Sequence, residues 1–180
     1  MKKLSILTIF FLLIFSMGCA HISTKDIESL PDFLRLEPWE GPHEEALEWV
    51  IMNGEPIREM TVESLLDDAN WYFVGPLGPF NECTLHPDLI LTGSKMNTHS
   101  PKTEAEIIYH VLVHVAQHRT MGWHGMEYYG HWIWDFITAG FNYKDMKKKG
   151  IEGEAYDLQA DFKRRIKRMD EPDDFRERRD

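Results

Sequence analysis

The chain has 180 residues and a formal net charge of −10, and this length suits one domain preceded by a targeting segment. Such an acidic chain lacks the basic surface that nucleic acids and anionic lipids require. We therefore expect no nucleic-acid partner.

The N-terminus has the pattern of an export signal. Two lysines precede an apolar run over residues 4–15, and Gly18 precedes Cys19. The run is too short to cross a membrane comfortably. The pattern resembles a bacterial lipoprotein signal, although Ser16 stands where Leu is usual. The resemblance implies lipidation of Cys19 and a membrane anchor, and Ala20 favours the outer membrane, facing the periplasm, in a Gram-negative cell.

Cleavage before Cys19 would leave 18 basic against 30 acidic residues, a net charge of −12. Cys83 would then be the only free thiol, so no intramolecular disulfide would support the fold. The predicted divisions are a signal peptide (1–18), a lipidated cysteine and tether (19–42), a folded domain (43–169) and a charged tail (170–180).

Hydrophobic periodicity predicts a helix-dominated α+β domain. Apolar residues recur at helical spacing over residues 43–52, before Gly54, and a short helix is expected over 61–69. Residues 70–74 and 88–92 are rich in aromatic and branched apolar residues, which indicates two strands of a small sheet. The C-terminal part is predicted to hold a helix over 124–141, a basic connector over 144–150 and a last helix over 152–169.

A central helix has clear predicted limits. Ser100 is a suitable N-cap, Pro101 fits the first helical position, and Gly122 is a plausible stop. The side chains between them leave little polar face, so this helix belongs in a core. His110 and His114 lie one turn and about 40° apart on it, so both imidazoles can reach one metal ion.

The spacing alone is weak evidence, because nine histidines in this length would give roughly 0.4 such pairs by chance. Buried imidazoles need partners, and a metal ion or ordinary hydrogen bonds could supply them. His118 lies about 12 Å along the helix from His110, and we expect it to cap the helix or lie at the surface. Asp135, one turn after His131, is expected to form an ordinary side-chain pair with it.

Three stretches together resemble a family of small bacterial zincin-like metallopeptidases of the gluzincin type. They are LHPDLIL at residues 85–91, HVLVHVAQ at 110–117 and IEGEAY at 151–156. The family has a His-Glu-Leu-x-His-x-x-Gln helix, an aromatic-rich second helix and a downstream Glu-x-Glu-Ala helix. The resemblance covers about residues 80–162 and implies a metal-binding helix packed on further helices and a small sheet.

The resemblance also implies a zinc site. His110, His114 and Glu152 would be the ligands, with Glu154 as the alternative third ligand and a fourth position left open. Tyr156, one turn after Glu152, would lie behind the ligands. Gln117 matches the family pattern without a role that the sequence defines. The implied chemistry is peptide hydrolysis.

Val111 departs from the family pattern. In an active zincin this residue is Glu, the general base that takes a proton from the attacking water, and losing such a base commonly costs about 100- to 10,000-fold in rate. Three interpretations stay open. In the first, another carboxylate replaces the base, with Glu106 a weak candidate and Glu154 or Asp157 further ones. In the second, the protein is an inactive relative that keeps zinc for structure or uses the cleft to bind a peptide or cell-wall component. In the third, the metal is lost and only the packing remains.

The sequence therefore predicts an exported lipoprotein of the cell envelope with a zincin-like metallopeptidase domain. We expect this domain to bind zinc and to be catalytically degenerate, a pseudoenzyme, with a peptide or cell-envelope component as its substrate or ligand. The alternative is a non-enzymatic binding or structural lipoprotein of the envelope.

Overall fold

The computed structural model describes residues 37–38, 41–67, 69–73, 82–86, 89–92, 99–121, 126–140 and 142–169. The predicted signal peptide, Cys19 and the charged tail lie outside these residues. Helices predominate in the described part of the chain, as the hydrophobic periodicity predicts.

The described elements are helices and short strands. The helices are α3 (Glu44–Asn53), α4 (Val62–Asp67), α5 (Pro101–Thr120), α6 (Met126–Thr138), α7 (Tyr143–Met146) and α8 (Gly150–Met169). The strands are β1 (Glu37–Pro38), β2 (Asn70–Phe73), β3 (Glu82–His86) and β4 (Leu89–Thr92).

The strands form one small mixed sheet in the order β1-β2-β4-β3. β2 and β4 pair in parallel, with Trp71 opposite Ile90, whereas β1–β2 and β3–β4 are antiparallel. The side chain of Ile90 is buried, so one face of the sheet contributes to the core.

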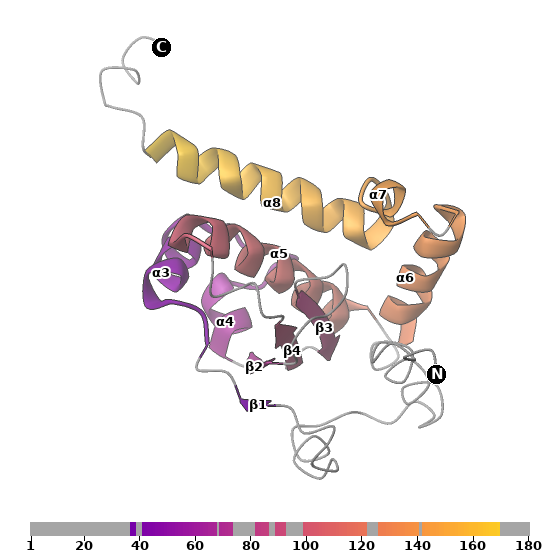
Figure 1. Cartoon of the computed structure of the whole chain (residues 1–180), viewed down its shortest axis with the longest axis horizontal. Coiled ribbons are helices and arrows are strands. Elements are labelled where there is room, and N and C mark those ends of the chain that lie inside the picture. Colours follow the sequence, from indigo (N-terminus) through magenta and orange to yellow (C-terminus); the bar gives the residue numbers. More distant parts are fainter. Residues whose placement is uncertain are drawn as a thin grey trace, which may run out of the picture.

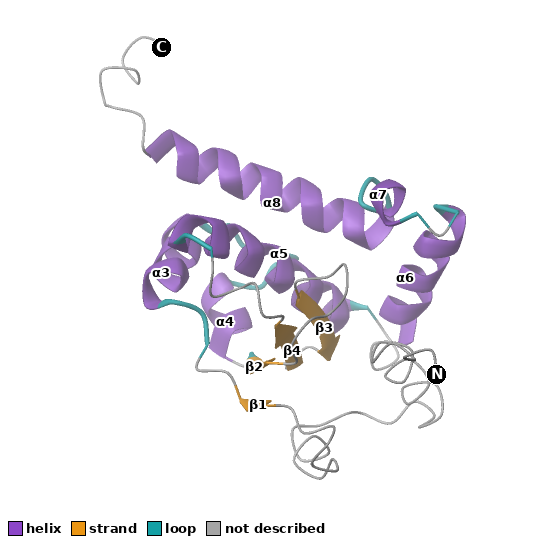
Figure 2. Ribbon diagram, viewed as in Figure 1, coloured by secondary structure: helices purple, strands orange, loops and turns teal. Residues whose placement is uncertain are grey.

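Helix α5 lies between α8 and the sheet (Figures 1 and 2). It also contacts α3 and α4, while α6 and α7 lie beside the first turns of α8. A helix covered on so many sides needs apolar side chains around most of its circumference. The predicted core position of this helix is confirmed.

The start of α5 follows the predicted capping pattern. The Ser100 hydroxyl accepts a hydrogen bond from the Thr103 amide at 3.4 Å, and Pro101 occupies the first helical position. The helix ends at Thr120, and the Met121 amide donates to the Gln117 carbonyl at 2.9 Å. Gly122, the predicted stop, lies outside the described residues.

A buried carboxylate ties α3 to α5. Glu104 is buried in the first turn of α5, where it accepts a hydrogen bond of 3.1 Å from the His43 amide and pairs with the His43 ring. Both partners thus satisfy a group whose burial would otherwise be costly. The contact aligns the N-terminal ends of two helices that are about sixty residues apart in the sequence.

Side-chain contacts fix α8 along α5. The rings of Tyr109 and Phe162 stack with their centroids 4.5 Å apart, and both side chains are buried. Beside them, Lys163 donates a hydrogen bond of 2.8 Å to Glu106. These contacts set the position at which the first turn of α8 meets the middle of α5.

Three elements were not predicted. β1 lies in the predicted tether and contains Pro38, which is tolerated because β1 is at the edge of the sheet. β3 alternates polar and apolar residues over only five positions and was not recognised, and α7 overlaps the lysine-rich segment expected to be a connector. The predicted helices over 43–52, 61–69, 124–141 and 152–169 and both predicted strands are confirmed with small shifts of their ends.

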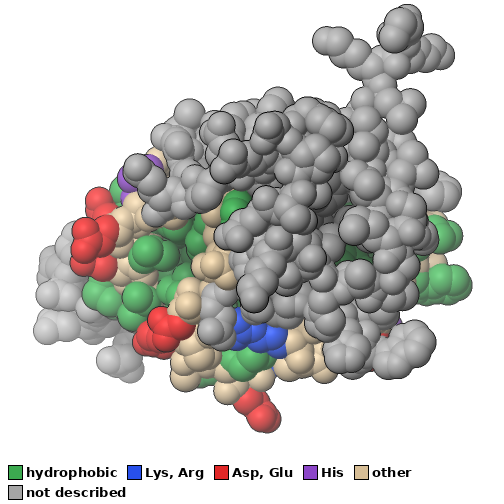
Figure 3. All heavy atoms as spheres, turned by 90° about the horizontal axis from the view of Figure 1, so that it is seen from below, with side chains coloured by type: hydrophobic (Ala, Val, Ile, Leu, Met, Phe, Trp, Pro, Cys, Tyr) green, Lys and Arg blue, Asp and Glu red, His purple; other side chains and the backbone are tan. Residues whose placement is uncertain are grey.

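Figure 3 shows acidic side chains at separated places on the visible face rather than in one patch. No helix in the described ranges is both long enough and apolar enough to cross a membrane.

The junction between α6 and α8 yields a stability prediction. Gly150 starts α8 with φ +55°, and a Cβ there would lie 1.8 Å from Oδ2 of Asp135, which accepts a hydrogen bond from the Ile151 amide. Gly150→Ala is therefore expected to lower the free energy of unfolding by about 2 kcal/mol, since the left-handed backbone and the displaced carboxylate both carry a cost. Urea denaturation followed by circular dichroism measures this change.

The matched control is Gly130→Ala on α6, where a Cβ would meet nothing within 4 Å. Alanine favours a helix over glycine by roughly 0.5–1 kcal/mol, so this variant should be as stable as the parent or more so. Equal destabilisation by both substitutions would contradict the role given to Gly150.

Candidate metal centre

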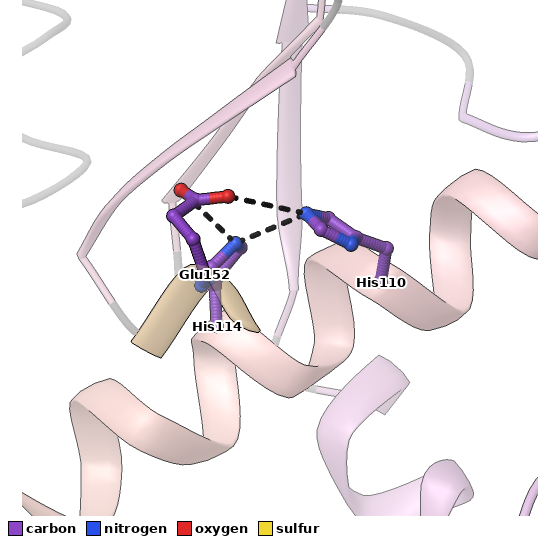
Figure 4. A group of neighbouring side chains, drawn as sticks. All are labelled: His110, His114 and Glu152. Carbon is purple, nitrogen blue, oxygen red and sulfur yellow. Dashed lines mark hydrogen bonds and ion pairs between the residues drawn. The ribbon is translucent and has the colours of Figure 1, made fainter. Parts of the chain in front are cut away.

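Helix α5 brings two imidazoles together in the core. His110 and His114 project from successive turns, and their Nε2 atoms are 3.1 Å apart (Figure 4). Two nitrogen lone pairs at this distance would repel each other. The two rings must therefore share a proton or face a common cation.

Glu152, in the first turn of α8, completes the group. Its Oε1 lies 3.6 Å from Nε2 of His114, and its Oε2 lies 4.0 Å from Nε2 of His110. The exposed fractions of the three side chains are only 12% for His110, 9% for His114 and 7% for Glu152. This buried group, with its ligand atoms all within 4.8 Å of one another, could hold a metal ion.

Contacts from α6 position the Glu152 carboxylate. The indole Nε1 of Trp132 donates a hydrogen bond of 3.2 Å to Oε1 of Glu152. At the preceding residue of α8, the Ile151 amide donates a hydrogen bond of 3.2 Å to Oδ2 of Asp135, which holds the start of the helix. Oε2 of Glu152 is buried and accepts no hydrogen bond from the described residues.

Burial keeps His110 neutral. Removal of the ring from water is the largest cause that lowers its pKa well below 6.5, and the nearby His114 and Lys147 lower it further. The Ala155 backbone and the Gln159 side chain act in the opposite direction but more weakly. A neutral imidazole is the form that can offer a lone pair to a metal ion.

Glu154, the alternative third ligand, is turned away from the imidazoles toward Arg58. The guanidinium donates to both carboxylate oxygens, at 3.0 Å to Oε1 and 2.6 Å to Oε2. Hydrogen bonding to Arg58 is the largest cause that lowers the pKa of Glu154. The structure thus brings Glu152, rather than Glu154, beside the two histidines.

The other predicted positions differ in their surroundings. Tyr156 lies against His110, with ring centroids 4.5 Å apart, and Gln117 Oε1 lies 2.8 Å from Nδ1 of His114. Glu106 instead forms its ion pair with Lys163 at 2.8 Å. Cys19 lies outside the described residues.

Val111 lies in the hydrophobic core, with only 2% of its surface exposed. Its neighbours in this cluster are apolar side chains from α3, α4, the sheet, α5 and α8. The residue that the resemblance aligns with the zincin general base therefore contributes to packing in this chain.

The prediction that His118 lies at the surface is wrong. His118 is 4% exposed, with ring centroids 5.0 Å from Tyr128 and 5.4 Å from Tyr129. The aromatic side chains of α6 cover this end of α5, which no spacing within α5 could reveal. The expected pairing of His131 with Asp135 is also absent from the described contacts, because His131 pairs with Glu127 at 3.7 Å.

Sequence reasoning missed the contributions of Trp132, Asp135 and Arg58. Trp132 and Asp135 lie three residues apart on α6, so both can face the start of α8. Arg58 lies in the turn between α3 and α4, where nothing in the sequence pairs it with Glu154.

Comparison of the chain with protein-family models, with curated proteins and with solved structures finds no match. The geometry of the site therefore carries the functional interpretation.

The lowered pKa of His110 predicts a pH effect on the metal-free protein. As the pH falls below about 6.5, unfolded chains bind a proton at this ring that the folded state resists, so the free energy of unfolding should decrease. His110→Gln should reduce this dependence. Urea denaturation in the presence of a chelator, at several values between about pH 7.5 and pH 5.5, measures it.

His131→Gln is the control, since this histidine is exposed on α6. The slope of stability against pH should remain that of the parent. A parent-like slope in His110→Gln would show that the buried ring is not the group responsible.

Proposed function

We propose that the chain is an exported, lipid-anchored envelope protein whose zincin-like domain binds zinc and has lost ordinary zincin catalysis. The observation that carries this proposal is the convergence of His110, His114 and Glu152 in a buried group. Two neutral nitrogens and one carboxylate suit zinc well, and the same donor set occurs in zinc hydrolases.

The distances fit this donor set. Zinc–nitrogen and zinc–oxygen bonds of about 2.0–2.2 Å at tetrahedral angles place ligand atoms roughly 3.3–3.6 Å apart. In the structure the two histidine nitrogens are 3.1 Å apart, and these nitrogens lie 3.6 and 4.0 Å from the carboxylate oxygens. Small side-chain adjustments would bring all three atoms around one ion.

The charge of the group also favours a cation. A buried carboxylate is costly unless it is paired, and the partners of Glu152 are one indole N–H and two imidazoles, one of them held neutral by burial. By contrast, Glu154 has a guanidinium as its partner. A divalent ion beside Glu152 would supply the missing positive charge.

The surrounding architecture supports a zincin-like assignment. The helix that carries both histidines contacts β3 on one side, and the downstream helix α8 supplies the carboxylate. This is the arrangement that the resemblance implies, with the ligands in the same order along the chain.

Zinc in such a site polarises carbonyl groups and lowers the pKa of water. Peptide hydrolysis also needs a residue that moves protons, and Val111 cannot do so. The buried position of Val111 favours a protein that retains the metal for structure, or for binding a peptide or cell-envelope component. Non-enzymatic binding is therefore the second candidate, and it shares the same metal centre.

Metal analysis tests the proposed site. The purified chain without its leader should contain one zinc ion per molecule. His110→Ala, which removes a ligand, and Glu152→Gln, which replaces the carboxylate with a weakly coordinating amide, should each weaken zinc binding by roughly 100-fold or more. Elemental analysis and competition with a chelating dye measure content and affinity.

His131→Ala, which removes an exposed histidine, should bind zinc as the parent does. A parent that binds no zinc, or a His110→Ala variant with parental affinity, would refute the metal centre.

Restoring the base tests the loss of catalysis. Val111→Glu should gain zinc-dependent peptidase activity by about 100-fold or more over the parent, the usual contribution of a general base. Hydrolysis of a quenched fluorescent peptide library measures this gain. Because a buried glutamate also destabilises the core, thermal denaturation accompanies the assay.

Val111→Gln is the matched control, since glutamine is polar and nearly the same size as glutamate but has no basic group. It should remain inactive. Zinc-dependent hydrolysis by the parent at the rate of Val111→Glu would overturn the proposed loss of catalysis.

A further inference from the structure

We infer that Gln117, held by Glu154 and the Ile151 carbonyl, fixes His114 in the tautomer that carries its hydrogen on Nδ1. Gln117 would thereby be a positioning residue for the metal centre. The consequence for metal affinity rests on the proposed function, but the tautomer itself does not.

The orientation of the Gln117 amide follows from its two acceptors. Its Nε2 lies 2.8 Å from the backbone oxygen of Ile151 and 3.1 Å from Oε2 of Glu154. Exchanging the amide nitrogen and oxygen would place oxygen against two oxygens in a buried position. The amide NH₂ group must therefore face α8, and the amide oxygen must face α5.

Arg58 establishes that the Glu154 carboxylate is ionised and can only accept hydrogen bonds. The guanidinium has only donors, and it reaches both oxygens of this carboxylate. Oε2 of Glu154 therefore acts as an acceptor toward Gln117 as well. A protonated oxygen at this position, which could reverse the Gln117 amide, is disfavoured by the bidentate pair.

The tautomer of His114 then follows. Its Nδ1 lies 2.8 Å from the amide oxygen of Gln117, which can only accept. Nδ1 must carry the hydrogen, and in the neutral ring Nε2 is left with its lone pair. That nitrogen is the one that faces His110 and Glu152.

In the metal-free protein, His110 should be the opposite tautomer, with its hydrogen on Nε2. With a lone pair on Nε2 of His114, the contact of 3.1 Å between the rings is a hydrogen bond only if Nε2 of His110 is the donor. Metal binding would require this hydrogen to leave Nε2 of His110, while the ring of His114 is already prepared.

The hydrogen-bonded chain ends at a constrained turn. Arg58 has φ 48°, a left-handed conformation that is uncommon for this residue type. Its Nη1 also donates to Oγ1 of Thr120 at 2.8 Å, in the last turn of α5. The turn after α3 is thus connected through Glu154 and Gln117 to His114.

Ring ¹⁵N chemical shifts of the metal-free protein near pH 7.5 test the inference directly. His114 signals, assigned by their loss in His114→Asn, should show protonated Nδ1 and unprotonated Nε2. Gln117→Leu, which keeps the approximate size but removes the acceptor, should give a mixture of tautomers. It should also weaken zinc affinity by about 10- to 100-fold, the usual effect of removing such a partner.

A second variant separates hydrogen bonding from packing. The exchange Gln117→Glu with Glu154→Gln keeps an acceptor toward Nδ1 and a donor–acceptor pair between the two side chains, so the parental tautomer should persist. The new carboxylate also faces the Ile151 carbonyl, so this variant should be less stable than the parent. A purely packing role predicts instead that Gln117→Leu keeps the parental tautomer. Asp161→Asn, which removes an acid elsewhere on α8, is the control.

Protonated Nε2 on His114 in the parent would overturn the inference, as would an unchanged tautomer in Gln117→Leu. If Gln117→Leu fails to fold, the parental spectrum and the exchanged pair decide the matter. A parent with the expected tautomer that binds no zinc would uphold the inference and refute the proposed metal function.

Discussion

A helix buried on most sides can carry imidazoles only where other groups satisfy their nitrogens, and this constraint on α5 organises the rest of the molecule. Most of the circumference of α5 is apolar and covered by α3, α8 and the sheet. The two histidines face the first turn of α8. This turn must therefore present groups that can pair with imidazole nitrogens, as Glu152 does. Asp135 and Trp132 on α6 hold it in place. The main contribution of α6 to the site is therefore to hold the first turn of α8, and with it Glu152, in position.

The carboxylates in and around the core differ in how their charge is compensated. Glu104 is matched by the amide and ring of His43, and Glu154 by the guanidinium of Arg58. Glu152 has an indole N–H and two imidazoles as neighbours. Glu104 and Glu154 thus have partners that compensate their charge and stabilise the fold. Glu152 lacks a strongly basic partner among the described contacts, which suits a residue that binds a ligand.

Local signals in the sequence predicted much of this arrangement. Ser100 and Pro101 defined the start of α5, and the spacing of His110 and His114 defined half of the site, because capping and helical periodicity are properties of neighbouring residues. The resemblance to zincin-like peptidases ranked Glu152 ahead of Glu154, and the geometry agrees with that order. The difference between these two glutamates arises from Arg58, which is 96 residues from Glu154 in the sequence.

What could not be predicted depends on contacts between distant segments. His118 was expected at the surface because its own helix gave no reason for burial, whereas the tyrosines of α6 cover it. β1 is stabilised by pairing with β2, and its two residues carry too little pattern to be recognised alone. The orientation of the Gln117 amide likewise depends on acceptors of α8 that only the folded chain brings near it.

The candidate ligands lie on α5 and α8, with α6 and α7 between them in the sequence. An ion bound by both helices would act as a covalent cross-link does, closing a loop of about forty residues and reducing the conformational entropy of the unfolded chain. A domain whose mature part is predicted to have a single thiol cannot obtain this effect from a disulfide. Metal release would then be coupled to separation of α8 from α5. The lifetime of the bound ion would therefore depend on how often these two helices move apart.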